Sequence, residues 1–352
     1  MRNSILAKDF NTDSNLHFME VLHEESLNLR SITPESFRSK FDESIAILDN
    51  LYIKDSRWVI AYSGGKDSTA LTVLALYMKK LHPDIQLTIT YSDTMMEIPE
   101  MSSVAYNYLT YLKDNFNSKV IIVKPDISDT FWVRMIGRGY PPPKAKFRWC
   151  TDKMKIKPSR KVNHDEGMFI TGMRIGESQQ RDIKLKNSCL STGANECGGD
   201  VWIRQKGIDV AAPIINWTSF DVWFFLQAIA IKAVPAVKYV IDLYGNTNMR
   251  FGCWMCTVVE KDKTMEIMAK SGNEKIQKML AFRLWLVEEA RKPENRYIRK
   301  NGIKGRLNKD FRREILRKVL ELEDEIQIPL ISKCEIKASQ LLLESDKYGE
   351  YP

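Results

Sequence analysis

The sequence predicts an α/β protein built on an open, mostly parallel twisted sheet with flanking helices. Two patterns lead to this fold class. Between residues 57 and 215, short apolar runs alternate with stretches of helical length, as in parallel βαβ units. On either side, apolar residues recur at helical spacing. We therefore expect a helical N-terminal segment over 1–56, an α/β domain over 57–215 and a helical C-terminal region over 216–352.

The expected elements follow in order along the chain. Thr33, Pro34 and Glu35 form a typical helix start. Helical stretches separate the first three predicted strands, so right-handed crossovers between parallel strands are expected. After about residue 213, the chain is expected to be largely helical. The apolar runs that predict strands lie at 58–62, 86–92, 119–125 and 167–173.

The composition is that of a globular protein, with 352 residues, 44% of them hydrophobic and 28% charged. The most apolar stretch, "VWFFLQAIAIKAVPAV", is interrupted by Lys232 and Pro235 and is too short to cross a bilayer. The first residues, "MRNSILAKDFNTDSN", contain no apolar core of a signal peptide. We expect a cytoplasmic protein with no membrane partner.

The net charge of +8 is concentrated in one segment. Residues 281–318 contain thirteen Lys/Arg and five Asp/Glu, so this segment alone accounts for the excess. Trp285, Tyr297 and Phe311 are interleaved with these basic residues. Basic residues mixed with aromatics suit a polyanion such as nucleic acid, but they also suit a solvated helical face whose aromatics turn into the core. The sequence leaves both interpretations open.

The stretch "SGGKDS" lies where the first predicted strand ends and a helix begins. Gly64 and Gly65 allow a tight turn and a close approach of the backbone to a ligand. The start of a helix offers N–H groups and a positive dipole end, which together bind anions. Lys66 adds a charge for phosphate oxygens, and Asp67 could hold a metal ion or orient the loop. The stretch is completed by two hydroxyl donors, Ser63 and Ser68.

This motif has neither the spacing of G-x-x-x-x-G-K-[ST] nor that of G-x-G-x-x-G. It resembles the SGGxDS signature of the PP-loop ATP pyrophosphatases, which have the adenine nucleotide alpha hydrolase-like fold. The resemblance implies that the loop binds ATP with Mg²⁺, and that Lys66 and Asp67 serve AMP transfer with release of pyrophosphate. It also implies that Ser92 and Asp93 lie beside the adenine and ribose. A plain Gly-Gly turn, and Asp93 as a helix cap, are the simpler alternatives.

Two further stretches, "KFRWCTDKMKIKP" and "FITGMRIGESQQRD", resemble the phosphoadenosine phosphosulfate reductase branch of these enzymes. In that branch a cysteine, a lysine-rich turn and a G-x-R-x-x-E-S-x-x-R segment surround the nucleotide. Arg174 and Arg181 suit bidentate binding of phosphate oxygens, and we take them as candidate catalytic residues. Arg and Glu four residues apart are also common on solvated helices. The residues that correspond to the branch are Cys150, Lys155, Arg174, Glu177, Ser178 and Arg181.

Six cysteines in a chain expected to be cytoplasmic indicate metal or redox chemistry rather than disulfides. The C-x-x-C of "RFGCWMC" alone fits zinc, a redox dithiol or an iron–sulfur cluster. Some reductases of the same branch hold a [4Fe–4S] cluster at these two regions. The resemblance therefore implies Cys150, Cys253 and Cys256 as ligands, completed by Cys197 or, alternatively, Cys189. Structural zinc is the competing metal.

The stretch "RFGCW-x-CTVVEKDK" closely resembles the corresponding stretch of the DndC proteins of bacterial DNA phosphorothioation and of the related SspD proteins. The resemblance covers about residues 57–266. It implies an ATP pyrophosphatase that activates a DNA backbone phosphate for sulfur insertion, with the cluster assisting sulfur transfer. DNA, a cysteine desulfurase and other DNA phosphorothioation proteins are the partners that it implies.

The chain departs from these relatives in two places. It lacks the additional cysteines that longer DndC chains carry before "RFGCW", so their fourth cluster ligand does not transfer. It also lacks the C-terminal Glu-Cys-Gly motif of sulfonucleotide reductases, since it ends in "ESDKYGEYP". A sulfonucleotide reductase, a tRNA thiolation enzyme and a zinc-stabilised nucleic-acid-binding module are the alternatives that the sequence leaves open.

Overall fold

The computed structural model describes residues 35–162, 167–176, 202–205, 208–245, 249–259, 261–299 and 301–345. Predictions for residues outside these ranges stay predictions. The candidate site residues that lie outside them are Glu177, Ser178, Arg181, Cys189 and Cys197.

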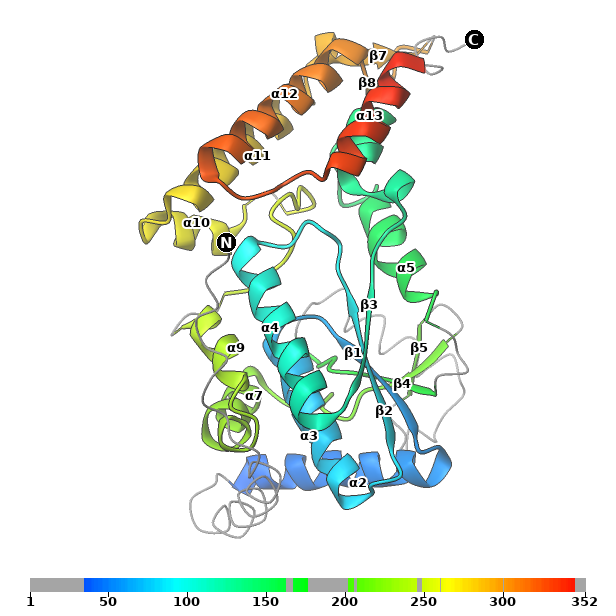
Figure 1. Cartoon of the computed structure of the whole chain (residues 1–352), viewed down its shortest axis with the longest axis vertical. Coiled ribbons are helices and arrows are strands. Elements are labelled where there is room, and N and C mark those ends of the chain that lie inside the picture. Colours follow the sequence, from blue (N-terminus) through cyan, green and yellow to red (C-terminus); the bar gives the residue numbers. More distant parts are fainter. Residues whose placement is uncertain are drawn as a thin grey trace. The chain divides into compact units, whose positions relative to one another are not determined.

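A six-stranded sheet with the order β3-β2-β1-β4-β6-β5 carries the fold (Figure 1). β1 pairs in parallel with β2 and β4, β4 pairs in parallel with β6, and β5 runs antiparallel at the edge. The predicted fold class, an open and mostly parallel α/β sheet, is therefore confirmed. The strands are β1 (Arg57–Tyr62), β2 (Gln86–Ser92), β3 (Lys119–Val123), β4 (Met168–Thr171), β5 (Trp202–Gln205) and β6 (Ile208–Ala211).

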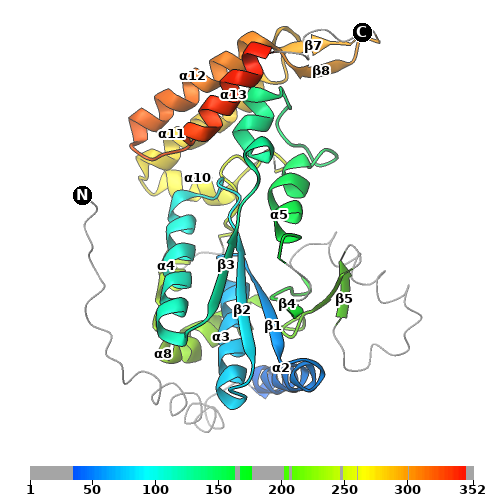
Figure 2. The ribbon, with the colours of Figure 1, turned by 45° about the vertical axis from the view of Figure 1, so that its right-hand side comes forward.

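The central strand β1 is apolar because both of its faces are covered. Trp58, Val59 and Ile60 are fully buried, as is usual for a strand inside a parallel sheet. Helices α3 (Lys66–Leu81) and α4 (Pro99–Phe116) connect β1 to β2 and β2 to β3. Both helices lie on the same side of these strands (Figures 1 and 2). This arrangement follows from two right-handed crossovers that progress in one direction across the sheet.

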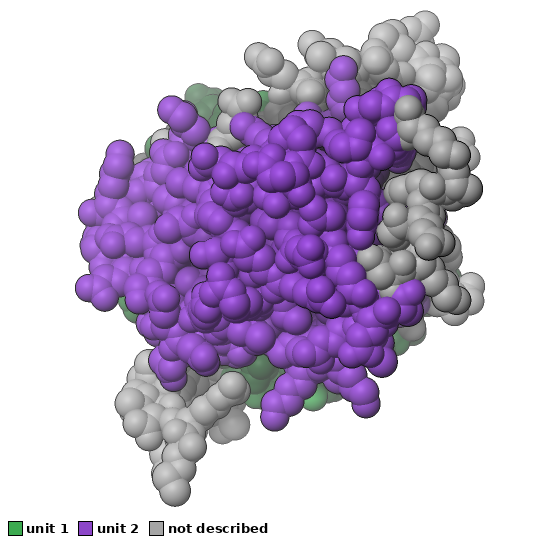
Figure 3. Space-filling model, turned by 90° about the horizontal axis from the view of Figure 1, so that it is seen from above, with its two compact units in different colours: residues 1–91, 104–121, 163–245 green, residues 92–103, 122–162, 246–352 purple. Residues whose placement is uncertain are grey.

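The chain forms two compact units, which Figure 3 shows in different colours. The sequence predicts contiguous domains, whereas these units are interleaved along the chain. The segments that follow β2 and β3 belong to the second unit together with the C-terminal region. Unit 1 comprises 1–91, 104–121 and 163–245, and unit 2 comprises 92–103, 122–162 and 246–352.

In unit 1, helix α2 (Glu35–Lys54) is part of the sheet domain rather than a separate segment. Ser44 Oγ donates to the carbonyl oxygen of Pro213 and accepts from Trp217 Nε1, each at 2.9 Å. Lys40 Nζ lies 2.7 Å from Asp221 Oδ2. Among its described residues, this unit also contains the helices α7 (Ser219–Phe224), α8 (Ile231–Ala233) and α9 (Val237–Tyr244).

Unit 2 contains most of the C-terminal helices and also a hairpin that the sequence did not predict. Its strands pair antiparallel, with Arg296 opposite Leu307. They were missed because each is only three or four residues long and basic, without an alternating apolar pattern. The predicted, largely helical C-terminal region is confirmed, and the hairpin adds two short strands to it. The elements are α5 (Lys157–Ser159), α10 (Lys263–Lys270), α11 (Glu274–Glu289), β7 (Arg296–Ile298), β8 (Lys304–Leu307), α12 (Lys309–Ile326) and α13 (Lys333–Ser345).

Neighbouring helices of unit 2 are joined by buried polar contacts as well as by apolar ones. The indole N–H of Trp132 donates to the carbonyl oxygen of Leu330 at 2.8 Å, and Arg312 Nη1 donates to that of Gly137 at 3.0 Å. Within the described ranges, no helix is both long and apolar enough to span a membrane.

Candidate functional site

The glycine loop "SGGKDS" follows the carboxyl end of β1, and its last three residues form the start of α3. β4 is the neighbour of β1 on the side opposite β2, and Ala61 is paired with Thr171. The strand order therefore reverses between β1 and β4, which is where open α/β sheets bind ligands. Gly64 has a φ of +78°, a left-handed conformation that glycine adopts without strain.

Two cations beside the glycine loop bind the same carboxylate. Lys66 Nζ lies 2.7 Å from Asp67 Oδ2, and Arg174 Nε lies 2.6 Å from Asp67 Oδ1. Arg174 Nη1 also donates to the carbonyl oxygen of Trp217 at 3.0 Å, and this residue is only 6% exposed. Because a buried guanidinium needs partners of this kind, Asp67 and Trp217 fix Arg174 beside the loop. The structure thus brings together Lys66, Asp67 and Arg174 from the predicted set.

The serines of the loop hold its backbone in place. Ser68 Oγ donates to the carbonyl oxygen of Gly65 at 2.9 Å and accepts from the Ser63 N–H at 3.1 Å. The two hydroxyl oxygens lie 3.1 Å apart. Gly65 is the cap residue of α3 and has no side chain that could accept from the first turn. A helix start of this kind is suited to an anion such as a phosphate group.

Sequence reasoning missed two residues that shape the glycine loop. A Cβ at Gly172 would lie 2.7 Å from the carbonyl oxygen of Asp67, so only glycine lets the end of β4 approach the loop. Tyr244 Oη lies 3.5 Å from Lys66 N, and a Cβ on Gly65 would lie 3.4 Å from it. The "TGMR" stretch carried a signal for Gly172, a glycine inside the predicted strand 167–173, where a glycine can mark a close approach of another backbone segment. Tyr244 is distant in sequence and had none.

Other predicted nucleotide-binding residues, Ser92 and Asp93, belong to unit 2. Ser92 Oγ lies 2.9 Å from the hydroxyl oxygen of Ser159. Asp93 is buried, accepts from the Met95 N–H at 2.7 Å and pairs with Lys124 at 3.1 Å. It thus stabilises a local turn. It does not cap the next helix, because α4 begins only at Pro99. Contact of either residue with a nucleotide stays a prediction.

Three predicted cluster ligands share one neighbourhood in unit 2. Burial raises the pKa of the Cys253 thiol to about 11, although the nearby Lys155 ammonium acts to lower it. Burial also raises the pKa of Cys150, and the charge of Cys256 adds to this effect. Cys253 Sγ lies 3.4 Å from Thr94 Oγ1. Lys155, predicted as a nucleotide-binding residue, therefore acts on the thiols through its charge.

The Cys253–Cys256 turn is anchored from several sides. The Cys256 N–H donates to the carbonyl oxygen of Cys253 at 2.9 Å, and Arg283 Nη2 donates to that of Cys256 at 2.6 Å. Glu97 is paired with Cys253 in an isolated β-bridge and accepts from Thr94 Oγ1 at 2.6 Å. Burial raises the pKa of this glutamate. Sequence reasoning missed Thr94 and Glu97, which follow β2 without a recognised motif.

The three thiols are suitable ligands for a metal that binds thiolates, but the described residues do not supply a complete set of ligands. Within those ranges, no three His, Cys, Asp or Glu side chains are arranged to hold a metal ion. The two candidates for the fourth ligand, Cys197 and Cys189, lie outside them. Cys334 lies on α13 and is exposed.

Many cations of the basic segment 281–318 are used inside unit 2. Arg283 and Arg312 are buried and donate to backbone carbonyl oxygens. Phe311 is buried and lies 5.8 Å from the ring of Trp285, with Lys318 Nζ 4.8 Å from the same indole. These contacts support the interpretation in which the segment builds the helical region. Binding of nucleic acid by this segment stays a prediction.

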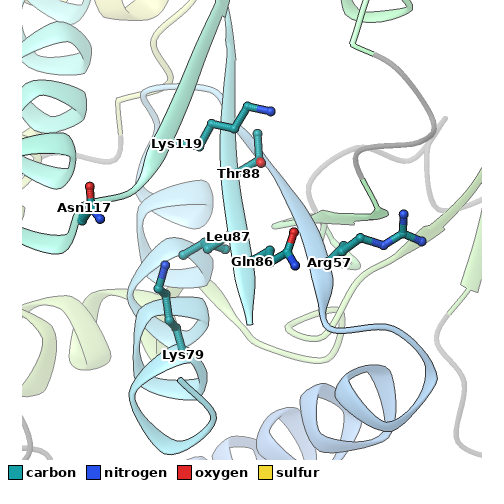
Figure 4. Close-up of a pocket in the computed structure, with 7 residues that line it drawn as sticks. All are labelled: Arg57, Lys79, Gln86, Leu87, Thr88, Asn117 and Lys119. Carbon is teal, nitrogen blue, oxygen red and sulfur yellow. The ribbon is translucent and has the colours of Figure 1, made fainter. Parts of the chain in front are cut away.

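A surface pocket lies elsewhere in unit 1, at the amino ends of the strands (Figure 4). Arg57, Gln86 and Lys119 are the first residues of β1, β2 and β3. The glycine loop lies at the opposite, carboxyl end of β1, so this pocket is separate from it. The lining residues are Arg57, Lys79, Gln86, Leu87, Thr88, Asn117 and Lys119.

The glycine loop and the C-x-x-C motif both lie in a region that matches a known protein family. The model of the phosphoadenosine phosphosulfate reductase domain matches residues 57–259. An uncharacterized protein of Methanocaldococcus jannaschii is 26% identical over 253 residues, which are 69% of this chain and 45% of that protein. The chain thus spans less than half the length of this relative.

Two further relatives have names that describe an activity. Sulfate adenylyltransferase subunit 2 of Azospirillum brasilense is 26% identical over 215 residues, covering 57% of this chain and 67% of that protein. Among solved structures, the phosphate complex of phosphoadenylyl-sulfate reductase from Candida auris matches with a TM-score of 0.41 and 13% identity. That match covers 66% of this chain and 94% of the other.

Proposed function

We propose a function from one premise: the chain belongs to the phosphoadenosine phosphosulfate reductase family. Members of such a family bind a nucleotide, and we infer that this chain binds ATP on its glycine loop. We further propose that it transfers AMP to an acceptor and releases pyrophosphate. The proposed acceptor is a backbone phosphate of DNA, so that sulfur can replace one of its non-bridging oxygens.

The observation that carries this proposal is the charge network of Lys66, Asp67 and Arg174. Asp67 holds a lysine and an arginine beside a helix start at the switch point of the sheet. Oxygens of a polyphosphate suit both cations, and the carboxylate suits the Mg²⁺ that accompanies a polyphosphate. In the proposed reaction, Lys66 binds the leaving phosphates and Arg174 stabilises the charge that develops around the α-phosphorus.

The proposed reaction has two transfers. A non-bridging oxygen of the phosphodiester attacks the α-phosphorus of ATP, and the bond from this phosphorus to the oxygen of the β-phosphate breaks. A sulfur donor, such as the persulfide of a cysteine desulfurase, then attacks the activated DNA phosphorus, and AMP leaves with the former oxygen. When the donor is a persulfide, a second thiol cleaves the resulting S–S bond, which leaves the sulfur on phosphorus.

The cysteines of unit 2 are the groups that would hold a metal in this proposal. Cys150, Cys253 and Cys256 would bind a [4Fe–4S] cluster, with one ligand from outside the described residues. When bound, such a cluster supplies sulfur or electron-transfer chemistry. Zinc is the alternative occupant. With either metal, the ammonium group of Lys155 would offset part of the charge of the nearby thiolates.

The sulfate adenylyltransferase match supports adenylyl transfer and suggests a second acceptor. That relative is named for transfer of an adenylyl group to sulfate. Sulfate is therefore the second candidate acceptor for this chain. It requires the same attack at the α-phosphorus, and the two acceptors can be compared in one assay.

The proposal is tested by measuring pyrophosphate release from ATP and Mg²⁺ with single-stranded DNA, duplex DNA, tRNA or sulfate. We expect DNA to stimulate release the most. Lys66→Ala should lower the rate by about a hundredfold or more, because it removes a cation from the reacting phosphates. Nuclease digestion and mass spectrometry, after addition of a cysteine desulfurase and cysteine, should then detect phosphorothioate dinucleotides.

The matched control is Lys79→Ala, a lysine on the same helix that lines the pocket of Figure 4. It should leave pyrophosphate release unchanged. If sulfate stimulates pyrophosphate release and DNA does not, sulfate is the acceptor instead of DNA. Equal rates for the wild type and Lys66→Ala would refute the role of the glycine loop.

A further inference from the structure

The loop that precedes Cys150 presents an aromatic ring to solvent between three cations. Lys144, Lys146, Phe147 and Arg148 are all exposed, and the Phe147 side chain is 46% exposed. We call residues 144–148 the stacking turn. Exposed aromatics are common singly, so the argument for a function depends on how this ring is held and on its surroundings.

The stacking turn has a defined backbone. The Lys144 N–H donates to the carbonyl oxygen of Phe147 at 3.2 Å, and the Phe147 N–H donates to that of Lys144 at 2.8 Å. Arg148 Nε donates to the carbonyl oxygen of Ala145 at 3.2 Å. Three consecutive prolines, residues 141–143, restrict the chain that enters it. The ring is thus presented by an ordered turn.

Phe147 stacks on a second ring that is itself held by cations. The rings of Phe147 and Tyr140 lie 6.2 Å apart with an interplanar angle of 12°. Arg134 and Arg306 place their guanidinium carbons 5.2 Å and 5.5 Å from the centre of the Tyr140 ring. Tyr140 also packs edge-on against buried Trp149. The stack therefore has a fixed inner ring and an exposed outer one.

The charges on the stacking turn itself are of one sign. Residues 140–151 include Lys144, Lys146 and Arg148 but no Asp or Glu. Among the described residues, neither lysine forms an ion pair. This differs from the segment 281–318, where several cations bind carbonyl oxygens or carboxylates. A ring with exposed cations on both sides complements a chain of phosphates that carries unpaired bases.

We propose that the stacking turn binds single-stranded nucleic acid, with one base on Phe147 and the flanking phosphates on the three cations. A single aromatic side chain can stack on a base only where that base is unpaired. The turn is also tied to the cysteine region, because Thr257 Oγ1 donates to the carbonyl oxygen of Pro143 at 2.6 Å and Trp149 directly precedes Cys150. Binding of a single strand by this turn does not depend on the proposed function. Only the statement that the bound strand is the substrate rests on it.

Fluorescence anisotropy with the full chain tests this proposal. The probe is a labelled oligonucleotide of about 12 deoxythymidines, a length within single-strand site sizes. Phe147→Ala should weaken its binding by about tenfold, and Phe147→Trp should retain it, because stacking needs a ring rather than phenylalanine itself. Replacing Lys144, Lys146 and Arg148 by alanine should reduce the slope of log affinity against log salt by about two.

Phe220→Ala is the matched control. Phe220 is 64% exposed and stacks on Phe224, but its neighbour is Asp221 and its surroundings lack the three cations. This variant should bind like the wild type. An oligonucleotide of the same length with abasic sites should bind the wild type as weakly as Phe147→Ala binds the intact one.

Two results would overturn the stacking turn as a binding surface. The first is equal binding of the intact oligonucleotide by the wild type and Phe147→Ala. The second is equal binding of the intact and abasic oligonucleotides by the wild type. Because anisotropy needs neither ATP nor a sulfur donor, these outcomes are independent of whether the chain releases pyrophosphate.

Discussion

The glycine loop and the cysteine turn contrast in how their charges are balanced. In the glycine loop, the single carboxylate of Asp67 already pairs with both Lys66 and Arg174, and the Ser68 hydroxyl donates to the loop backbone. In the cysteine turn, burial raises the pKa of Cys253 to about 11, so its thiol stays protonated at neutral pH. The charges of the first region are paired before any ligand binds, whereas the Cys253 thiol would be charged at neutral pH only if a bound metal displaced its proton.

This contrast predicts that the largest effect comes from Asp67→Asn. The substitution removes the charge that holds two cations together and a carboxylate suited to Mg²⁺, so pyrophosphate release should fall by about a thousandfold. Steady-state pyrophosphate assays would measure it, with circular dichroism to confirm folding.

Asp221→Asn separates this effect from simple loss of a buried ion pair. Asp221 also pairs with a lysine, Lys40, and is more deeply buried than Asp67, but it lies at the start of α7. Asp221→Asn should lower the free energy of unfolding about as much as Asp67→Asn does, but it should retain pyrophosphate release. Equal activity losses in the two variants would remove the distinction that we draw for Asp67.

The second prediction concerns the reactivity of Cys253 in metal-free protein. With a pKa two units above that of an ordinary thiol, Cys253 should react with iodoacetamide at pH 8 about a hundredfold more slowly than exposed Cys334. Its rate should rise until about pH 11. Mass spectrometry of alkylated peptides would follow both residues, and prior loading with iron and sulfide or with zinc should protect Cys253 but not Cys334.

The same shift gives the sign of the pH dependence of stability. Between about pH 9 and pH 11 the thiol is ionised in the unfolded chain but protonated in the native one. The native state then binds more protons, so the free energy of unfolding of the metal-free protein falls as pH rises through this range. Cys253→Ser should reduce this dependence. An unchanged dependence would place its origin at other groups.

The smallest predicted effect compares one glycine from each region. Gly172→Ala places a Cβ 2.7 Å from the backbone of Asp67, whereas a Cβ on Gly252 meets nothing within 4 Å. We expect Gly172→Ala to lower the free energy of unfolding by about 1–3 kcal/mol and to raise KM for ATP. Gly252→Ala should change neither. Chemical denaturation and ATP titration would measure both variants, and a harmless Gly172→Ala would show that β4 can move away from the loop.

The sequence was sufficient for features that depend on local patterns. The alternation of apolar runs and helices predicted the parallel sheet, and "SGGKDS" predicted the loop after β1. Features that depend on the choice of tertiary partner were missed. Nothing local shows that Arg283 and Arg312 turn inward to carbonyl oxygens, or that Tyr244 meets the start of α3.

The interleaving of the two units also limits how the protein can fold and evolve. The backbone passes from one unit to the other five times, so no single cut separates them. Neither unit is completed by a continuous stretch of translated chain, and the first can close only after residues near position 245 have emerged. Exchange of one segment between related genes would therefore divide at least one unit. A new segment that carries the glycine loop or the cysteine turn would have to pack against the remaining segments of its own unit.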